Sequence, residues 1–150
     1  MLVERLRRLL PAMWAGVLLC LAAGAAPAAF DLLERAEAGR LAGRFFAQEA
    51  WLSLVLAVLL LAIERGRARA AAALGNGSVL STDMLLLLGT LFCTVAGYFA
   101  LQPMMAAARA GQGSLSFGQL HLISAGFFSL KGLLVLALAW RAARPAGFRG

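Results

Sequence analysis

Residues 120–140 read LHLISAGFFSLKGLLVLALAW, an apolar run with a single lysine, Lys131, near its middle. The run is long enough to cross the hydrocarbon core of a bilayer, which takes about 20 helical residues. A lysine at the centre of a spanning helix costs about 2.5–3.5 kcal/mol, whereas each Leu, Ile, Val or Phe contributes about −0.3 to −0.6 kcal/mol. The run contains eleven of these residues, so their sum of roughly −3 to −7 kcal/mol offsets the lysine. The run therefore predicts a transmembrane helix that carries a charged group.

The composition of the whole chain also indicates a membrane protein. Of its 150 residues, 62% are hydrophobic and 14% are charged, and the mean hydropathy is +0.83. An average soluble domain is about 45–50% apolar and about 25% charged. A particle of this size has too small an interior to bury so large an apolar excess. Disorder is excluded because it requires low hydrophobicity.

Three more apolar runs precede this one, so we expect a single all-α domain over residues 1–150, an integral membrane four-helix bundle. The predicted spans are residues 9–30, 45–63, 84–101 and 120–140. Turn-forming residues separate the later spans, including Gly75-Asn76-Gly77 and Gly111-Gln112-Gly113. Each break between spans is therefore interpreted as a loop.

Stripes of small and polar residues predict which faces pack together, because helices in lipid associate through such residues. In the last span, His121, Ser124, Phe128 and Lys131 lie within about 80° of one another at 100° per residue. The corresponding residues of the first span are Gly16, Cys20, Ala23 and Pro27, and those of the third are Thr90, Cys93, Thr94 and Gly97.

A short interfacial helix is expected between the first two spans. Asp31-Leu32-Leu33-Glu34 has the spacing of a capping box, and Arg40 and Arg44 come late, where a helix dipole favours cations. We expect this helix to begin near Leu32 and to lead into the second span. A plain charged loop is the alternative.

The distribution of charge predicts the topology. The chain carries 14 basic and 7 acidic residues, a formal net charge of +7, in short groups between apolar runs. Nucleic-acid binding would need the basic residues on one exposed face, so we expect no nucleic-acid partner. Nine arginines lie in the two termini and the second loop, and four lie in the other loops: Arg5, Arg7, Arg8, Arg65, Arg67, Arg69, Arg141, Arg144 and Arg149 against Arg35, Arg40, Arg44 and Arg109. By the positive-inside rule, both termini are cytoplasmic.

The N-terminal segment has a second interpretation. Basic residues 1–8, apolar residues 9–21 and the Ala-rich text up to Pro27 resemble a signal peptide. The apolar character continues to Phe30, so we expect a retained first span. Cleavage would leave three helices and place the N-terminus outside. The arginine-rich and alanine-rich composition predicts a bacterial source, and hence the inner membrane.

A candidate intramembrane polar site consists of Glu49, His121, Ser124 and Lys131. Glu49 enters the second span about one turn outward of its middle, within reach of a long lysine side chain. We predict a Glu49–Lys131 pair, with Gln48 or Ser53 nearby, that satisfies both charges inside the protein. A structural role for this pair is one reading, and a proton or small-solute pathway is another. Snorkelling of Lys131 or neutralisation of either residue are further alternatives.

No catalytic constellation is visible in the sequence. A single histidine excludes multi-histidine zinc and di-iron sites, and no nucleophile has a base beside it. Cys20 and Cys93 both fall inside spans, which gives no support to a disulfide or a thiol redox centre. We expect a non-enzymatic protein without a cofactor. A weaker alternative is a Cu(I) site, since Met104, Met105 and His121 supply soft sulfur and imidazole.

Several short motifs carry a resemblance to a known family. They are Pro27-x-x-Phe30-x-x-Leu33, Arg35, Ala38-Gly39, Gly43-Arg44-Phe45-Phe46, Pro103-x-Met105 with Arg109, and Phe117-x-x-x-His121-x-x-Ser124. This pattern resembles a bacterial membrane family of unknown function that shares its domain with the transmembrane-protein-205-like proteins. The resemblance covers residues 9–140. It implies a four-helix integral membrane protein with no established activity.

These observations predict a small polytopic inner-membrane protein that acts as an accessory or structural component. Its expected partners are the lipid bilayer and either further copies of itself or another membrane protein. The alternative is a transporter-like protein, or one that handles a metal or a small solute, using Glu49, His121 and Lys131.

Overall fold

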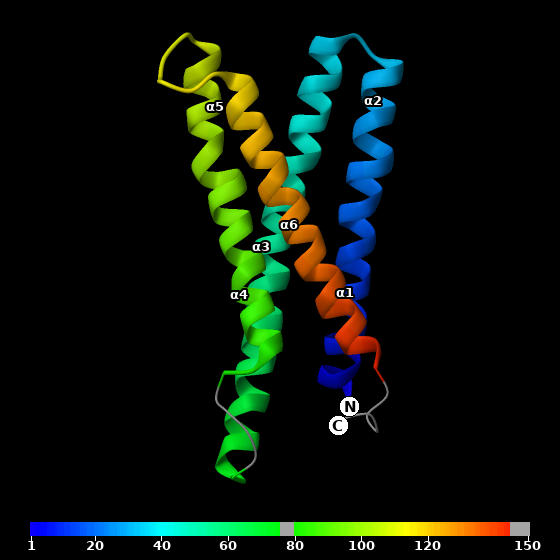
Figure 1. The fold of residues 1–150 in the computed structure, drawn as a ribbon. Helices are drawn as coiled ribbons and strands as arrows, with labels where there is room; N and C mark the ends of the chain where they lie inside the picture. Colours follow the sequence, from blue (N-terminus) through cyan, green and yellow to red (C-terminus); the bar gives the residue numbers. More distant parts are fainter. Residues whose placement is uncertain (76–79, 145–150) are drawn as a thin grey trace.

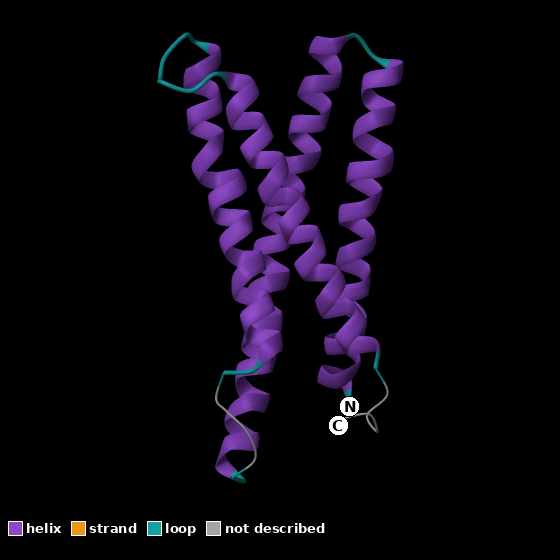
Figure 2. Cartoon of the chain, in the orientation of Figure 1, coloured by secondary structure: helices purple, strands orange, loops and turns teal. Residues whose placement is uncertain are grey.

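The computed structural model describes residues 1–75 and 80–144. Figure 2 shows that every regular element in these ranges is helical. The elements are α1 (Leu2–Cys20), η1 (Leu21–Ala25), α2 (Ala26–Leu32), α3 (Arg35–Ala73), α4 (Thr82–Thr94), η2 (Val95–Ala100), α5 (Leu101–Arg109) and α6 (Phe117–Ala143), where η denotes a π-helical segment. The all-helical fold class is confirmed.

Four continuous helices in the described residues are long and apolar enough to cross a membrane. They are Leu2–Leu32, Arg35–Ala73, Thr82–Arg109 and Phe117–Ala143. Each contains one of the four predicted spans. The helices run past the predicted limits because their charged ends are also helical; the longest, α3, adds residues 35–44 before its apolar run and residues 64–73 after it.

Helix α6 holds the arrangement together. It packs against α1 and α4, and α3 packs against the same two helices. Figure 1 shows α6 crossing the other helices diagonally, with the start of α1 and the end of α6 at the same end of the molecule. Side chains from all four long helices meet in one apolar cluster around Trp14, Leu60, Leu87 and Leu138. A smaller cluster joins α5 to α6 through Leu101, Met105 and Leu120.

The predicted packing stripe is correct in the third span and wrong in the first. Thr90, Cys93, Thr94 and Gly97 are all buried. In the first span, which comprises α1, η1 and α2, Gly16, Cys20, Ala23 and Pro27 are exposed, and the buried face is formed by Trp14, Ala15, Leu18, Leu21 and Ala29. The buried face of this span is therefore not the face that carries the predicted stripe.

Among the described residues, Pro11, Pro27 and Pro103 all lie within continuous helices, and the last two follow π-helical segments. A proline has no N–H to donate and its ring crowds the carbonyl four residues earlier, which breaks regular α-helical bonding. Pro27 follows η1 and Pro103 follows η2, and π-helical turns are a known way to accommodate such an irregularity. Helices α2 and α5 then extend the first and third spans.

The expected interfacial helix does not form a separate element. Within residues 31–44, all of which the structure describes, Asp31 and Leu32 end α2 and α3 begins at Arg35. Glu34 precedes α3 without a side-chain capping bond, so the predicted capping box is wrong. The reversal takes only Leu33 and Glu34, both extended, because α3 continues its helical turns outward past the apolar run.

Helices η2 and α6 approach each other closely at Gly97. The Ser124 hydroxyl donates a hydrogen bond of 2.7 Å to the Gly97 carbonyl oxygen. A Cβ atom on Gly97 would lie 2.4 Å from the Cβ of Phe127, closer than two carbon atoms can pack. Glycine at this position is therefore required by the spacing of the two helices.

Gly97→Ala is expected to lower the unfolding free energy by about 1–3 kcal/mol, because the added methyl group forces the two helices apart. Gly126→Ala is the matched control, since a Cβ there meets no atom within 4 Å. Thermal unfolding of both variants in mild detergent, followed by circular dichroism, measures the difference. Equal stability of the two variants would contradict the close approach.

Candidate functional site

A chain of four polar side chains crosses the middle of the molecule. The Trp14 indole N–H donates to the Ser53 hydroxyl oxygen over 2.9 Å, and the Ser53 hydroxyl donates to Glu49 Oε1. Lys131 Nζ lies 2.7 Å from both carboxylate oxygens of Glu49. The structure therefore brings Glu49 and Lys131 together, with Ser53 beside them, and links α1, α3 and α6.

The position of each residue follows from helical geometry. Glu49 and Ser53 are four residues apart in α3, so they share one face of the helix. Lys131 lies in the centre of α6, and its four-carbon stem carries the ammonium group to α3. Glu49 is 5% exposed and Lys131 is 3% exposed. Isolated charges at such depth would be very costly, whereas a pair with further hydrogen bonds compensates much of that cost.

Aromatic and aliphatic side chains enclose this ion pair. Lys131 Nζ lies 5.0 Å from the ring centroid of Phe128, which meets Phe46 edge to face at 5.3 Å between centroids. Phe46 and Phe128 each precede their charged residue by three positions, so this aromatic pair lies one turn away on the side of the α5–α6 loop. Trp14 and the main apolar cluster lie on the other side.

The buried polar side chains all have hydrogen-bond partners. In α4, the Thr90 hydroxyl donates to the Leu87 carbonyl over 2.7 Å, and the Thr94 hydroxyl donates to the Thr90 carbonyl over 2.9 Å. Across the described residues, no fully buried side-chain nitrogen or oxygen lacks a partner. Each fully buried polar atom of the described side chains thus has at least one partner within the protein.

His121 and Ser124 are not part of this polar chain. The Ser124 hydroxyl bonds to Gly97, and His121 is exposed, stacked at 16° on the Phe117 ring with 5.8 Å between centroids. The Arg109 guanidinium lies 4.4 Å from the centroid of the same ring. His121 precedes Lys131 by ten residues, about 15 Å along a helix. The four predicted residues therefore lie in two separate places.

The soft-ligand alternative has less geometric support. Met105 is buried in the small cluster with Leu101 and Leu120, whereas Met104 is exposed. The two thioethers occupy different environments because successive helical residues differ by about 100° in direction. Cys20 and Cys93 are free thiols, the first exposed and the second buried.

Sequence reasoning missed the tryptophan donor. Trp14 is 1% exposed and anchors the polar chain, whereas Trp51 is 62% exposed. Trp51 instead contacts Phe99 edge to face, with 5.1 Å between ring centroids. An early sign was available, since Trp14, Leu18 and Leu21 share the spacing of one helix face.

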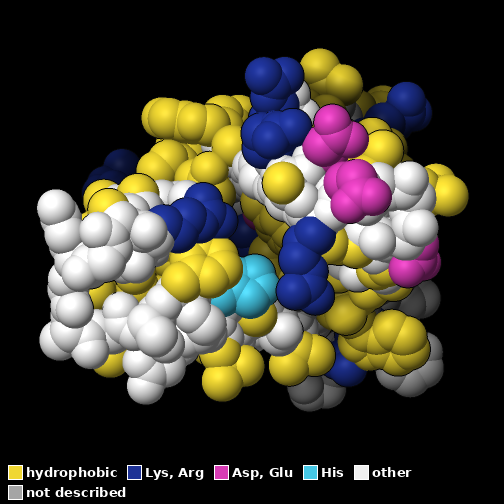
Figure 3. All heavy atoms as spheres, turned by 90° about the horizontal axis from the view of Figure 1, so that it is seen from above, with side chains coloured by type: hydrophobic (Ala, Val, Ile, Leu, Met, Phe, Trp, Pro, Cys, Tyr) yellow, Lys and Arg dark blue, Asp and Glu magenta, His cyan; other side chains and the backbone are white. Residues whose placement is uncertain are grey.

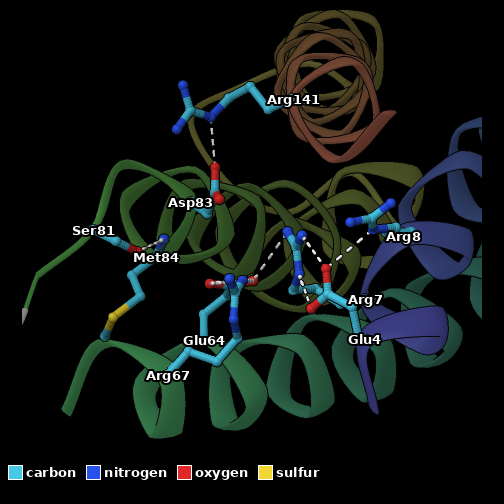
Figure 4. A network of polar contacts seen from close by, with 9 residues as sticks. All are labelled: Glu4, Arg7, Arg8, Glu64, Arg67, Ser81, Asp83, Met84 and Arg141. Carbon is cyan, nitrogen blue, oxygen red and sulfur yellow. Dashed lines mark hydrogen bonds and ion pairs between the residues drawn. The ribbon is translucent and has the colours of Figure 1, made fainter. Parts of the chain in front are cut away.

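A second polar cluster, also missed, joins the ends of all four long helices. Figure 4 shows its ion pairs: Arg7 lies 2.7 Å from Glu4 and 3.7 Å from Glu64, and Arg141 lies 2.5 Å from Asp83. A small pocket adjoins it, lined by Arg7, Glu64 and Asp83 and by apolar residues of the core. Glu4, Glu64 and Asp83 lie just outside the predicted spans, and no local pattern in the sequence indicates that they come together.

The residues that carry the family resemblance lie in several different environments. Pro27 and Pro103 follow the π-helical segments, and Arg109 contacts Phe117. Phe30, Gly39 and Gly43 are exposed. A Cβ atom on Gly39 or Gly43 would meet nothing within 4 Å, so this face of α3 is open in the chain.

A family model described as a domain of unknown function, DUF4149, matches residues 9–114. The match includes Trp14, Glu49 and the motif residues up to Arg109, and it ends before α6 and therefore before His121 and Lys131. The sequence resemblance had been extended to residue 140, which this match does not cover. No curated protein and no solved structure matches the chain.

Breaking the ion pair from one side is expected to destabilise the protein strongly. Glu49→Gln leaves Lys131 buried without a counter-charge, and Lys131→Leu leaves Glu49 in the same condition, each at a cost of about 3–5 kcal/mol. The double variant should lose clearly less than the sum of the two. Thermal unfolding in detergent of all four proteins tests this coupling. Simple additivity would show that the pair contributes no mutual stabilisation.

Proposed function

The chain belongs to the DUF4149 family, a domain family of unknown function, and we propose that it is a non-enzymatic accessory protein of the bacterial inner membrane. The observation that carries the proposal is the hydrogen-bonded chain Trp14–Ser53–Glu49–Lys131. A catalytic or transport group must be free to exchange a proton or a ligand. Here both carboxylate oxygens of Glu49 are bonded, and Lys131 is enclosed by protein. Such a pair suits a clamp that fixes how three helices are arranged.

A fixed bundle offers its outer surface to partners. Large apolar side chains remain exposed along the spans, among them Trp51, Phe92, Leu122 and Leu133. In a membrane this surface contacts lipid, a second copy of the chain or another membrane protein. The proposal includes the kinship with transmembrane-protein-205-like proteins, which the motifs around Pro27 and Pro103 support.

The proposed topology places both termini in the cytoplasm. The start of α1 and the end of α6 lie at one end of the molecule (Figure 1), and four spans return the chain to the side where it began. The arginine count is nine to four in favour of that end, which is the bias of cytoplasmic segments.

A green fluorescent protein fused after Gly150 is expected to fluoresce in bacterial cells, because this reporter folds in the cytoplasm. An alkaline phosphatase fusion at the same position should be inactive. Fusions of both reporters after Gly113, in the α5–α6 loop, should give the opposite pattern. Active phosphatase after Gly150 would overturn the proposed orientation.

The second candidate is a transporter-like protein that handles a proton, a metal or a small solute. It is favoured by one observation, the presence of two ionisable side chains deep within the spans. Intramembrane charges commonly mark ion or solute pathways. In this case Glu49 and Lys131 would separate during a working cycle, and His121 would lie at the entrance.

A thermal-shift panel of metals, pH values and small solutes distinguishes the two functions. For an accessory protein we expect no added metal or solute to raise the melting temperature, because ligands stabilise only a protein that binds them. A shift that is lost in Glu49→Gln but kept in His121→Ala would identify the ion pair as a ligand site. A shift lost only in His121→Ala would place that site at the loop end of α6.

A further inference from the structure

The end of the bundle where α1 begins and α6 ends separates its charges into two sets. The inner set is the network of Figure 4, in which all three carboxylates are engaged. Its members are Glu4, Arg7, Arg8, Glu64, Arg67, Asp83 and Arg141. The acidic groups of this end are therefore already neutralised by neighbouring arginines.

The second set, the arginine rim, consists of Arg5, Arg65, Arg69 and Arg144. All four are exposed, and among the described residues none has an acidic partner within ion-pair distance. Arg5 lies next to Glu4 in α1, Arg65 follows Glu64, and Arg144 is three residues beyond Arg141. The rim residues are therefore close in sequence to the inner network and add four positive charges without an ion-pair partner among the described residues.

The opposite end has four arginines, the same number as the rim, but in a different arrangement. Its acidic residues Asp31, Glu34 and Glu37 are exposed among the arginines, and Arg40 lies 3.7 Å from Glu37. Figure 3 shows acidic and basic side chains close together on that face, with the histidine nearby. Local charge there is largely balanced, so the two ends provide matched sets of four arginines in contrasting surroundings.

We propose that the arginine rim binds the phosphate groups of anionic phospholipids. Guanidinium groups pair with phosphate through two parallel hydrogen bonds, and basic residues beside a span attract anionic lipids. The rim lies where the apolar spans end, since Ile63 precedes Arg65 by two residues. Leu2 and Leu9, on either side of Arg5, are exposed. A diacyl lipid can therefore contact the rim and the neighbouring apolar surface at once.

An exposed tryptophan at this end of α6 indicates the same depth in the membrane. Trp140 is 71% exposed and adjoins Arg141, and tryptophan is enriched where the hydrocarbon core meets the headgroups. Lipid binding at the rim is independent of the proposed accessory role, because this binding depends only on the charge of one end of the bundle.

The test compares lipid retention by the full chain in nonionic detergent, using native mass spectrometry. Phosphatidylglycerol and phosphatidylcholine with identical acyl chains are the probes. The wild type is expected to retain phosphatidylglycerol with about a tenfold preference, which weakens as salt is added. The variant R5Q/R65Q/R69Q/R144Q should lose this preference, and R35Q/R40Q/R44Q/R109Q, with the same change in charge, should keep it.

Three outcomes overturn the proposal. The rim variant could keep the preference, the control could lose it equally, or glycerol 3-phosphate at the lipid's concentration could displace the lipid. The last result would assign the rim to soluble phosphates. Circular dichroism confirms that the variants are folded. If the fourfold variant is unfolded, R5Q/R144Q and R65Q/R69Q are measured separately, and each should lower the preference.

Discussion

The buried ion pair between Glu49 and Lys131 is the interaction on which the arrangement of helices depends. Lipid tails are as apolar as leucine, so helices in a membrane gain little from burying aliphatic side chains against each other. A buried carboxylate and ammonium that must pair with each other select one arrangement of the helices far more strongly than aliphatic contacts do. Their contact sets the rotation of α3 and α6, and the bond from Trp14 to Ser53 adds α1 to the same arrangement.

The two ends of the bundle depend on this centre in different ways. On one side the polar chain continues into the apolar cluster around Trp14 and then into the ion pairs of Arg7 and Asp83, so charge and packing alternate along the bundle. On the other side Phe46 and Phe128 cover the pair. Beyond them, α2 packs with α3 and α5 packs with α6, so cohesion there comes from two separate hairpins.

Sequence alone predicted the four spans, because each depends on a local sum of side-chain transfer energies. It also predicted a Glu49–Lys131 pair, since two opposite charges at similar depth have few other partners. It could not identify Trp14 as the donor that completes the polar chain, because that contact depends on how α1 is rotated. The capping box at Asp31 was wrong because α3 extends past its apolar run and begins only after Glu34. Both the contact of Trp14 and the residue at which α3 begins depend on tertiary packing, which no local pattern encodes.

The π-helical segments before Pro27 and Pro103 determine how their spans respond to a change in the number of residues. A π-helical turn contains more residues than an α-helical turn, so each segment accommodates additional chain without lengthening the helix in proportion. Loss of one residue from η1 would therefore convert the π-helical turn into an α-helical turn and leave Ala29 facing α3. The same loss from an α-helical part of the span would rotate everything after it by about 100°. Single-residue deletions are thus absorbed in these two segments, whereas elsewhere in the same spans they act as rotations of a whole helix end.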